Sequence, residues 1–224
     1  MTRNDDPSDP LPVAPLTLAQ KLAILDDLGI RRASCCTIDY LRAKLGDRRP
    51  EHEFSDLFAV LTWERCVLAE TGETVRCSTD VMVFDFECID QPIAYSGILH
   101  ELNDLFRGSL SLTKINSHVD RVVKTAWATC EAGGKVYRVD LEWKDDWADS
   151  KIIDFVTDIA KELGVERRLA YIDGGGQNIT LFALTEAELG EMRRRTGLDV
   201  NWVWEIPAHI AAILRSYETE RGSE

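Results

Sequence analysis

The stretch VKTAWATCEAGGKVYRVDLEWK, residues 123–144, decides the fold class. Polar and apolar residues alternate in two runs, Val123–Glu131 and Lys135–Lys144, on either side of Gly133 and Gly134. Alternation with a period of two is typical of strands that bury one face, and a glycine pair supplies the positive φ angles of a tight hairpin turn. The stretch therefore predicts an antiparallel β-hairpin.

The two faces of this hairpin differ in character. On the predicted core face, small residues of one strand meet larger residues of the other: Ala126, Ala128 and Cys130 beside Tyr137, Val139, Leu141 and Trp143. The reverse face carries Thr125, Trp127, Thr129, Arg138, Asp140 and Glu142. This face is mostly polar, with one tryptophan among charged side chains.

Helix start and stop signals recur along the rest of the chain. A capping-box pattern opens a helix at Thr17, with Gln20 three residues later, and a second such pattern joins Thr185 to Glu188. Helices are expected over 17–29, before Gly46, and over 51–61, 97–107, 149–164, 185–197 and 207–217, with a strand over 80–89. Arg193, Arg194 and Arg195 fall in the last turn of their helix, where cations are favoured.

These elements predict an α+β fold. An antiparallel or mixed sheet built from hairpins, with helices packed on one face, is expected to follow a small helical N-terminal region. The expected organisation is a disordered tail over 1–15, the helical region over 16–64, the α+β domain over 65–217 and a frayed end over 218–224. The tail combines prolines with acidic residues and has few large apolar groups.

Three consecutive glycines, Gly174–Gly176, raise the possibility of a phosphate-binding loop. Such a loop leads into a helix N-terminus. Here it leads instead into Asn178–Leu184, a β-branched and apolar run, with no Lys-Ser or Lys-Thr pair. We therefore expect a hairpin turn.

Composition limits the function classes. The chain of 224 residues has a net charge of −13, which opposes unassisted binding to nucleic acid and favours a basic partner or simple solubility. We expect a cytoplasmic location, because neither a membrane-spanning run nor a signal peptide is recognisable. The six cysteines lack zinc-site spacing and are expected to be reduced thiols; no cofactor or metal is predicted.

Two alternative functions remain: a metal-dependent nuclease and a DNA-binding protein. Asp85, Glu87, Glu142 and Lys144 resemble the carboxylates and lysine of a metal-dependent nuclease, although a solvated strand face produces the same pattern. The N-terminal helices carry a local surplus of basic residues, which could contact DNA or answer the protein's own acids. These residues are Arg31, Arg32, Arg42, Lys44, Arg48 and Arg49.

The reverse face of the hairpin and its exit form the principal candidate site. Aromatic rings amid carboxylates suit a basic protein partner, because the rings supply contact area and the acids steer association. The candidate residues are Trp127, Asp140, Glu142, Asp145, Asp146, Trp147 and Asp149. The alternative is that another layer covers Trp127 and that the aspartates only favour a helix N-terminus.

Three stretches, Phe84–Ile89 with Tyr95, Asp145–Asp149 and Asp173–Gln177, resemble an uncharacterised family of small bacterial proteins, over about Leu18–Trp202. The resemblance implies no reaction, cofactor or catalytic residue. Small, acidic, cytosolic α+β proteins are similar in charge, size and fold class to immunity proteins of bacterial toxin systems, which block a cognate toxin that is often a basic nuclease. The implied function is a non-enzymatic protein-binding module, by analogy of fold class.

Overall fold

The computed structural model describes residues 16–46 and 54–205. Its helices are α1 (Leu18–Asp27), α2 (Ile38–Leu45), α3 (Phe54–Trp63), α4 (Ala94–Leu105), α5 (Lys151–Glu162) and α6 (Glu186–Thr196), with a 3-10 turn, η1 (Val203–Glu205). Its strands are β1 (Arg65–Val67), β2 (Thr74–Arg76), β3 (Met82–Asp85), β4 (Thr113–Asp120), β5 (Thr125–Ala132), β6 (Lys135–Glu142), β7 (Arg168–Asp173), β8 (Asn178–Leu184) and β9 (Asn201–Trp202). The expected tail over 1–15 and the expected helix over 207–217 lie outside the described residues.

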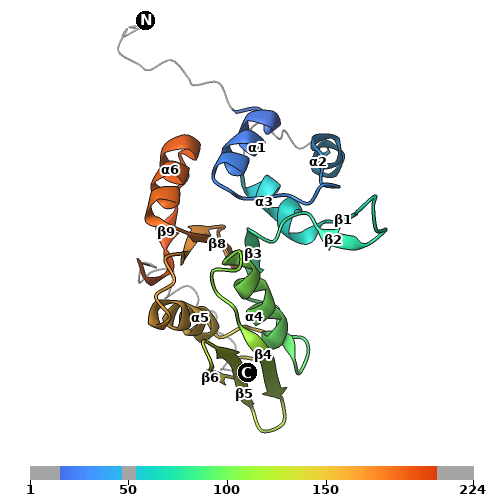
Figure 1. Cartoon of the computed structure of the whole chain (residues 1–224). Helices are drawn as coiled ribbons and strands as arrows, with labels where there is room; N and C mark the ends of the chain where they lie inside the picture. Colours follow the sequence, from blue (N-terminus) through green and yellow to red (C-terminus); the bar gives the residue numbers. More distant parts are fainter. Residues whose placement is uncertain (1–15, 47–53, 206–224) are drawn as a thin grey trace, which may run out of the picture.

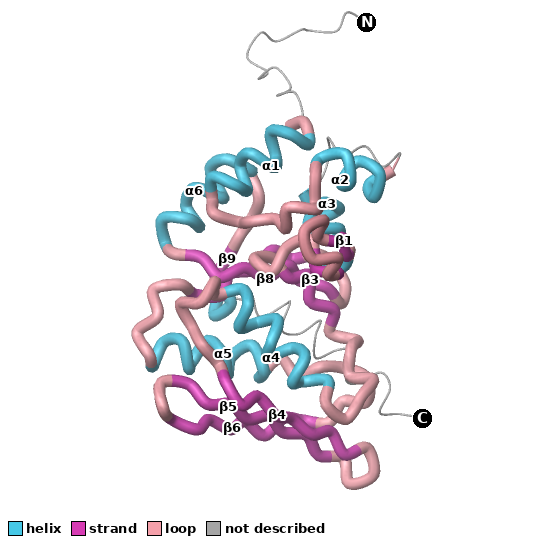
Figure 2. Tube along the Cα trace, turned by 45° about the vertical axis from the view of Figure 1, so that its right-hand side comes forward, coloured by secondary structure: helices cyan, strands magenta, loops and turns pink. Residues whose placement is uncertain are grey.

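The elements form four layers (Figures 1 and 2). Helices α1, α2, α3 and α6 cover one face of a middle sheet, and α4 and α5 cover its other face. The outer sheet of β4, β5 and β6 packs on the far side of α4 and α5. This arrangement confirms an α+β fold with antiparallel sheets.

The middle sheet has the strand order β3-β8-β7-β9, and all its pairs are antiparallel. Alternate residues of its strands enter two different hydrophobic cores. Leu181 on β8, for example, packs in the core with α4 and α5, whereas its neighbour Phe182 packs in the core with the N-terminal helices. Helices therefore cover both faces of this sheet, and the expectation of helices on one face is corrected.

The outer sheet contains the hairpin predicted from residues 123–144. Strands β5 and β6 pair with Ala128 opposite Val139, and Gly133 and Gly134 connect them with φ angles of 55° and 79°. Positive φ at both central residues is the geometry that a two-residue hairpin of this kind needs. The core face is Ala126, Ala128 and Cys130 against Tyr137, Val139 and Leu141, as the alternation predicts.

The glycine-rich segment turns the chain. Gly174–Gln177 joins β7 to β8, and a Cβ on Gly174 would lie 2.8 Å from the carbonyl oxygen of Asn178. Gly175 donates its backbone N–H to the Asp173 carboxylate. The loop is therefore a hairpin connection that leads into a strand, as expected.

The strand predicted over 80–89 is shorter in the structure, where β3 covers only Met82–Asp85. After Asp85 the chain changes partner. The backbone N–H groups of Ala148 and Ile89 donate to the carbonyls of Phe86 and Asp146, respectively, so the segment after β3 pairs with the loop before α5.

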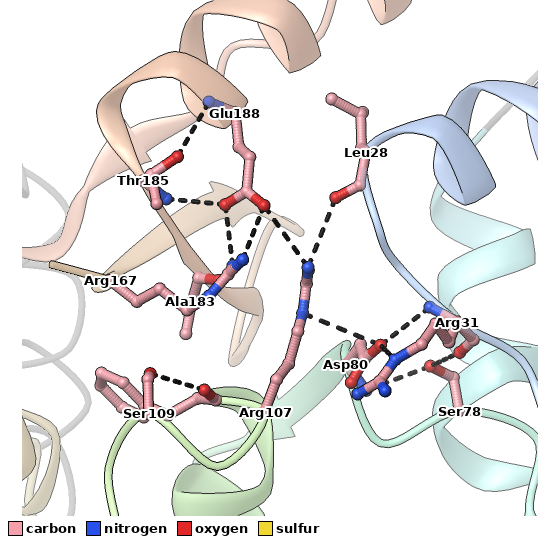
Figure 3. A network of polar contacts seen from close by, with 11 residues as sticks. Leu28, Arg31, Ser78, Asp80, Arg107, Ser109, Arg167, Ala183, Thr185 and Glu188 are labelled. Carbon is pink, nitrogen blue, oxygen red and sulfur yellow. Dashed lines mark hydrogen bonds and ion pairs between the residues drawn. The ribbon is translucent and has the colours of Figure 1, made fainter. Parts of the chain in front are cut away.

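A buried polar network joins the N-terminal helices, β3 and α6 (Figure 3). Arg107, at the end of α4, donates from Nη1 to the carbonyl oxygen of Leu28 and lies 3.5 Å from Glu188. Its Nε lies 3.7 Å from Asp80, whose carboxylate also accepts the backbone N–H of Arg31 at 2.8 Å. Burial lowers the pKa of Arg107, and the neighbouring Arg167 adds to this. Four segments that are distant in sequence therefore meet at one guanidinium.

The cysteines depart from the expectation of six reduced thiols. Cys35, before α2, and Cys66, in β1, form a disulfide with Cα atoms 5.7 Å apart, while Cys36, Cys77, Cys88 and Cys130 are free. The two partners are 31 residues apart in sequence. Their spacing contains no signal of this contact, because only the fold brings the hairpin of β1 and β2 to the segment before α2.

Candidate functional site

The principal candidate site lies on the outer sheet. We call the side chains of His118, Trp127, Arg138, Asp140 and Glu142 the Trp127 face. They share one face, because His118 and Asp140 are the cross-strand partners of Trp127, while Arg138 and Glu142 lie two residues either side of Asp140. Within the described residues, no helix or strand packs on this face, which is the outermost layer in Figure 2.

Trp127 is half-buried and lies between two side chains of the neighbouring strands. The Arg138 guanidinium lies 5.0 Å from the centre of its ring, and the His118 ring lies 6.2 Å away. Arg138 also donates from Nε and Nη2 to Asp140, the latter at 2.7 Å. The indole ring is thus held in one orientation by an exposed cation whose charge Asp140 balances.

Glu142 is exposed at the end of β6 and forms an ion pair with Lys151 at 2.6 Å. The hydrogen bond from Lys151 lowers the pKa of Glu142, and the charges of Lys151 and Lys144 contribute in the same direction. Glu142 therefore stays ionised at neutral pH and contributes negative charge at the edge of the Trp127 face.

The loop after β6 is held by its backbone. Trp147 forms isolated β-bridges with Lys144 and with Glu87, and its side chain is half-buried. Asp145 is exposed with a φ of 60°. Asp146 is less exposed, and its carbonyl accepts from Ile89. Of the three loop residues in the candidate set, Asp145 is the one that projects most openly to solvent.

Asp149 does not lie on the surface. Its relative exposure is 1%, and its carboxylate accepts the backbone N–H groups of Glu142 at 2.8 Å and Lys151 at 3.1 Å. Its own N–H donates to the hydroxyl of Tyr95, which is also buried. Asp149 therefore joins β6, α5 and α4 from inside, which makes it a structural residue and removes it from the contact surface.

We expect Tyr95→Phe to lower the free energy of unfolding by about 1–3 kcal/mol. The substitution leaves the buried N–H of Asp149 without its hydrogen-bond acceptor. Urea unfolding followed by circular dichroism would measure the loss. Tyr40→Phe removes a hydroxyl that bonds Arg65 in a more exposed site and should cost less; equal losses would contradict the prediction.

The turn between β4 and β5 adds an apolar element that sequence analysis missed. Val122 and Val123 are 90% and 64% exposed, and both donate their N–H groups to Asp120. These bonds lower the pKa of Asp120. Lys124 lies over the Trp143 ring at 5.0 Å and links the turn to the loop after β6. The adjacent valines followed by a basic residue were the available signal, but only the structure shows that their side chains point to solvent.

The residues of the nuclease-like alternative are arranged as follows. Gln177 donates to Asp85 at 2.8 Å and to Glu87 at 3.1 Å, so the glycine-rich turn closes over these two carboxylates. Glu142 lies 3.9 Å from Lys144, which follows β6, and the backbone of Trp147 forms isolated β-bridges with both Lys144 and Glu87. Among the side chains of residues 16–46 and 54–205, no three His, Cys, Asp or Glu groups are placed to hold one metal ion.

The basic residues of the N-terminal helices are paired with carboxylates. Among the described residues, Arg31 pairs with Asp80, Arg32 with Asp26, Arg42 with Asp39 and Lys44 with Glu64. Arg48 and Arg49 lie outside the described residues. These ion pairs favour the hypothesis that the four described cations balance the protein's own acids, and DNA binding by this region stays a prediction.

Comparison of the chain with protein-family models, curated proteins and solved structures found no match. A functional assignment therefore depends on the geometry of the site. In the described part of the chain, no helix is long and apolar enough to cross a membrane.

Proposed function

We propose that the protein is a non-enzymatic binding module that docks a basic protein partner on the Trp127 face, most concretely an immunity-type inhibitor that covers a basic toxin surface. The observation that carries the proposal is Trp127, a half-buried residue of the central strand β5 with partners on both β4 and β6, on the face of a sheet that is the outermost layer of the described residues. Partly exposed tryptophans flanked by charged side chains are typical centres of protein interfaces.

The charge around the face supports a basic partner. Asp140 and Glu142 are exposed carboxylates paired with Arg138 and Lys151, Asp145 adds a further exposed carboxylate, and the chain as a whole carries −13. Such a field accelerates the encounter with a cation-rich surface, and raising the salt concentration weakens it. Association should therefore slow as salt is added.

The shape of the face supports a protein rather than a small ligand. The face extends over the three strands β4, β5 and β6, and the Val122–Val123 turn adds exposed apolar area to it. Arg138 already orients the indole ring, so little side-chain freedom is lost when a partner covers it. The proposal needs no cofactor, nucleic acid or membrane, and it includes a cytoplasmic location that fractionation of the host would test.

The first experiment is an affinity capture of the tagged full-length protein from its host, with identification and weighing of the complex. A stoichiometric basic partner is expected. We further expect Trp127→Ala to weaken its binding by about 2 kcal/mol or more, and Asp145→Asn to slow association while leaving dissociation nearly unchanged. Asparagine tolerates the positive φ at this position, so the substitution removes only charge.

The matched controls lie on the opposite layer of the molecule. Trp63→Ala removes another exposed tryptophan, at the end of α3, and Glu186→Gln removes an exposed charge from α6. Both should bind as wild type. If the two pairs of variants behave alike, or if the captured partner is acidic, the Trp127 face is not the docking site.

A further inference from the structure

Four of the six cysteines gather where the segment before α2 meets the hairpin of β1 and β2. Cys66 and Cys77 lie on one face of the hairpin, because Cys66 pairs with Val75 and Cys77 follows two residues later, bonded to the carbonyl of Glu64. The facing segment supplies the adjacent residues Cys35 and Cys36. Cys35 is joined to Cys66, which leaves Cys36 and Cys77 as neighbouring free thiols.

The two free thiols contact each other directly. Their side chains share a hydrogen bond, and both residues are buried. The backbone holds them in place, since Ala33 donates its N–H to the carbonyl of Cys77 and accepts the N–H of Cys36. The bonded thiols thus join the same two segments as the disulfide.

The hydrogen bond makes the two sulfurs unequal. It lowers the pKa of Cys77, against the opposing effect of burial, and it raises the pKa of Cys36, where burial acts in the same direction. Cys36 is therefore the donor and Cys77 the sulfur on which a thiolate forms more easily. A thiolate is the reactive form of cysteine towards oxidants.

Cys36 is part of the lining of an open hollow of about 330 Å³, whereas its hydrogen-bonded partner Cys77 is fully buried and is not part of that lining. It is lined by Asp26, residues 31–34, Cys36 and Thr37. A water molecule occupies about 30 Å³ in the liquid, so a reagent little larger than water fits this hollow easily. To reach Cys77, peroxide in this hollow must pass Cys36, which requires a small opening of the segment before α2; a larger oxidant, such as a protein disulfide, would require a larger movement.

We propose that Cys36 and Cys77 are a peroxide-oxidisable thiol pair whose oxidation gives a second disulfide beside Cys35–Cys66. This site is independent of the Trp127 face and does not rest on the proposed binding function. It is a modification site, and its oxidant is hydrogen peroxide.

The chemistry balances in two steps. In the first step the Cys77 thiolate attacks one peroxide oxygen, the O–O bond breaks, and Cys77 becomes a sulfenic acid. The hydroxide that leaves with the electron pair takes up the proton that Cys77 had released and becomes water. Cys36 Sγ then attacks the Cys77 sulfur, the S–S bond forms, and the S–O bond breaks. The departing hydroxide takes the Cys36 proton, so two thiols and one peroxide yield one disulfide and two waters.

The test uses the full chain purified without reductant and treated with hydrogen peroxide. Alkylation and peptide mapping at successive times should show Cys36 and Cys77 lost together and joined to each other. Cys88 and Cys130 serve as internal references, because burial raises their pKa values to about 12 and about 11. They should react at least about tenfold more slowly.

Serine variants distinguish the sulfur that reacts with peroxide, Cys77, from the sulfur that then forms the disulfide, Cys36. In Cys36→Ser, a sulfenic acid on Cys77 should persist and be trapped when the oxidised chain is unfolded in the presence of dimedone, whereas Cys77→Ser should remove the fast reaction at Cys36. Cys130→Ser should react as wild type. The wild-type map decides the question even if a serine variant fails to fold: Cys36 and Cys77 reacting no faster than Cys88, or Cys77 joined to any cysteine other than Cys36, would overturn the proposal.

Discussion

Asp80→Ala is expected to lower the free energy of unfolding by about 3–5 kcal/mol. Asp80 is 1% exposed and accepts both the backbone N–H and the Nε of Arg31. The substitution also leaves the Arg107 guanidinium without the nearby Asp80 carboxylate, although the Arg107 side chain is only 8% exposed. Glu188, at 3.5 Å and already bonded twice to Arg167, would then be the nearest acid to this buried cation.

Urea unfolding would measure this loss of stability. A double-mutant cycle would show how much of it comes from the interaction between Asp80 and Arg107. Adding Arg107→Met to Asp80→Ala should recover part of the stability, because the stranded charge is gone. Asp39→Ala breaks an exposed ion pair with Arg42 and should cost no more than about 1 kcal/mol. If Asp80→Ala costs as little as Asp39→Ala, the network in Figure 3 does not stabilise the fold.

The second large effect is expected at Phe182→Ala, which should cost about 3–5 kcal/mol. Phe182 is fully buried on β8 and meets the ring of Phe58 edge to face, with centroids 5.2 Å apart. The substitution opens a cavity between the middle sheet and α3 and removes this aromatic pair. Thermal or urea unfolding measures the change.

Val122→Ala is the control for this substitution, since its side chain is 90% exposed and its loss should change stability by no more than about 0.5 kcal/mol. Far-ultraviolet and near-ultraviolet circular dichroism should report the same midpoint for Phe182→Ala. Two separated transitions would show that the cores on either side of β8 unfold independently.

Local chemistry made much of the fold predictable. The capping boxes of Thr17 with Gln20 and of Thr185 with Glu188 are both formed, because a cap involves residues only three positions apart. The Gly133–Gly134 turn was predictable for the same reason: positive φ at a two-residue connection leaves few alternatives to glycine.

Contacts between distant segments were not predictable from these rules. Periodicity shows that β8 is apolar throughout, but it cannot show that its two faces enter different cores. The aromatic and acidic residues around Asp149 predict a contact surface or a helix N-terminus, whereas Asp149 is buried and bonded to Tyr95, which is 54 residues away. The Cys35–Cys66 disulfide and the exposed Val122 side chain depend in the same way on the assembled fold.

The strand order of the middle sheet has a consequence for the time course of folding during synthesis. Its first strand, β3, ends at Asp85, yet its hydrogen-bonding partner β8 begins only at Asn178. Helices α4 and α5 and the outer sheet are translated in between and have many contacts among themselves. The N-terminal helices emerge first from the ribosome, but the strands that complete their core are synthesised last. Their apolar faces therefore stay exposed until almost the entire chain has been made, and a chaperone would be needed most during this time.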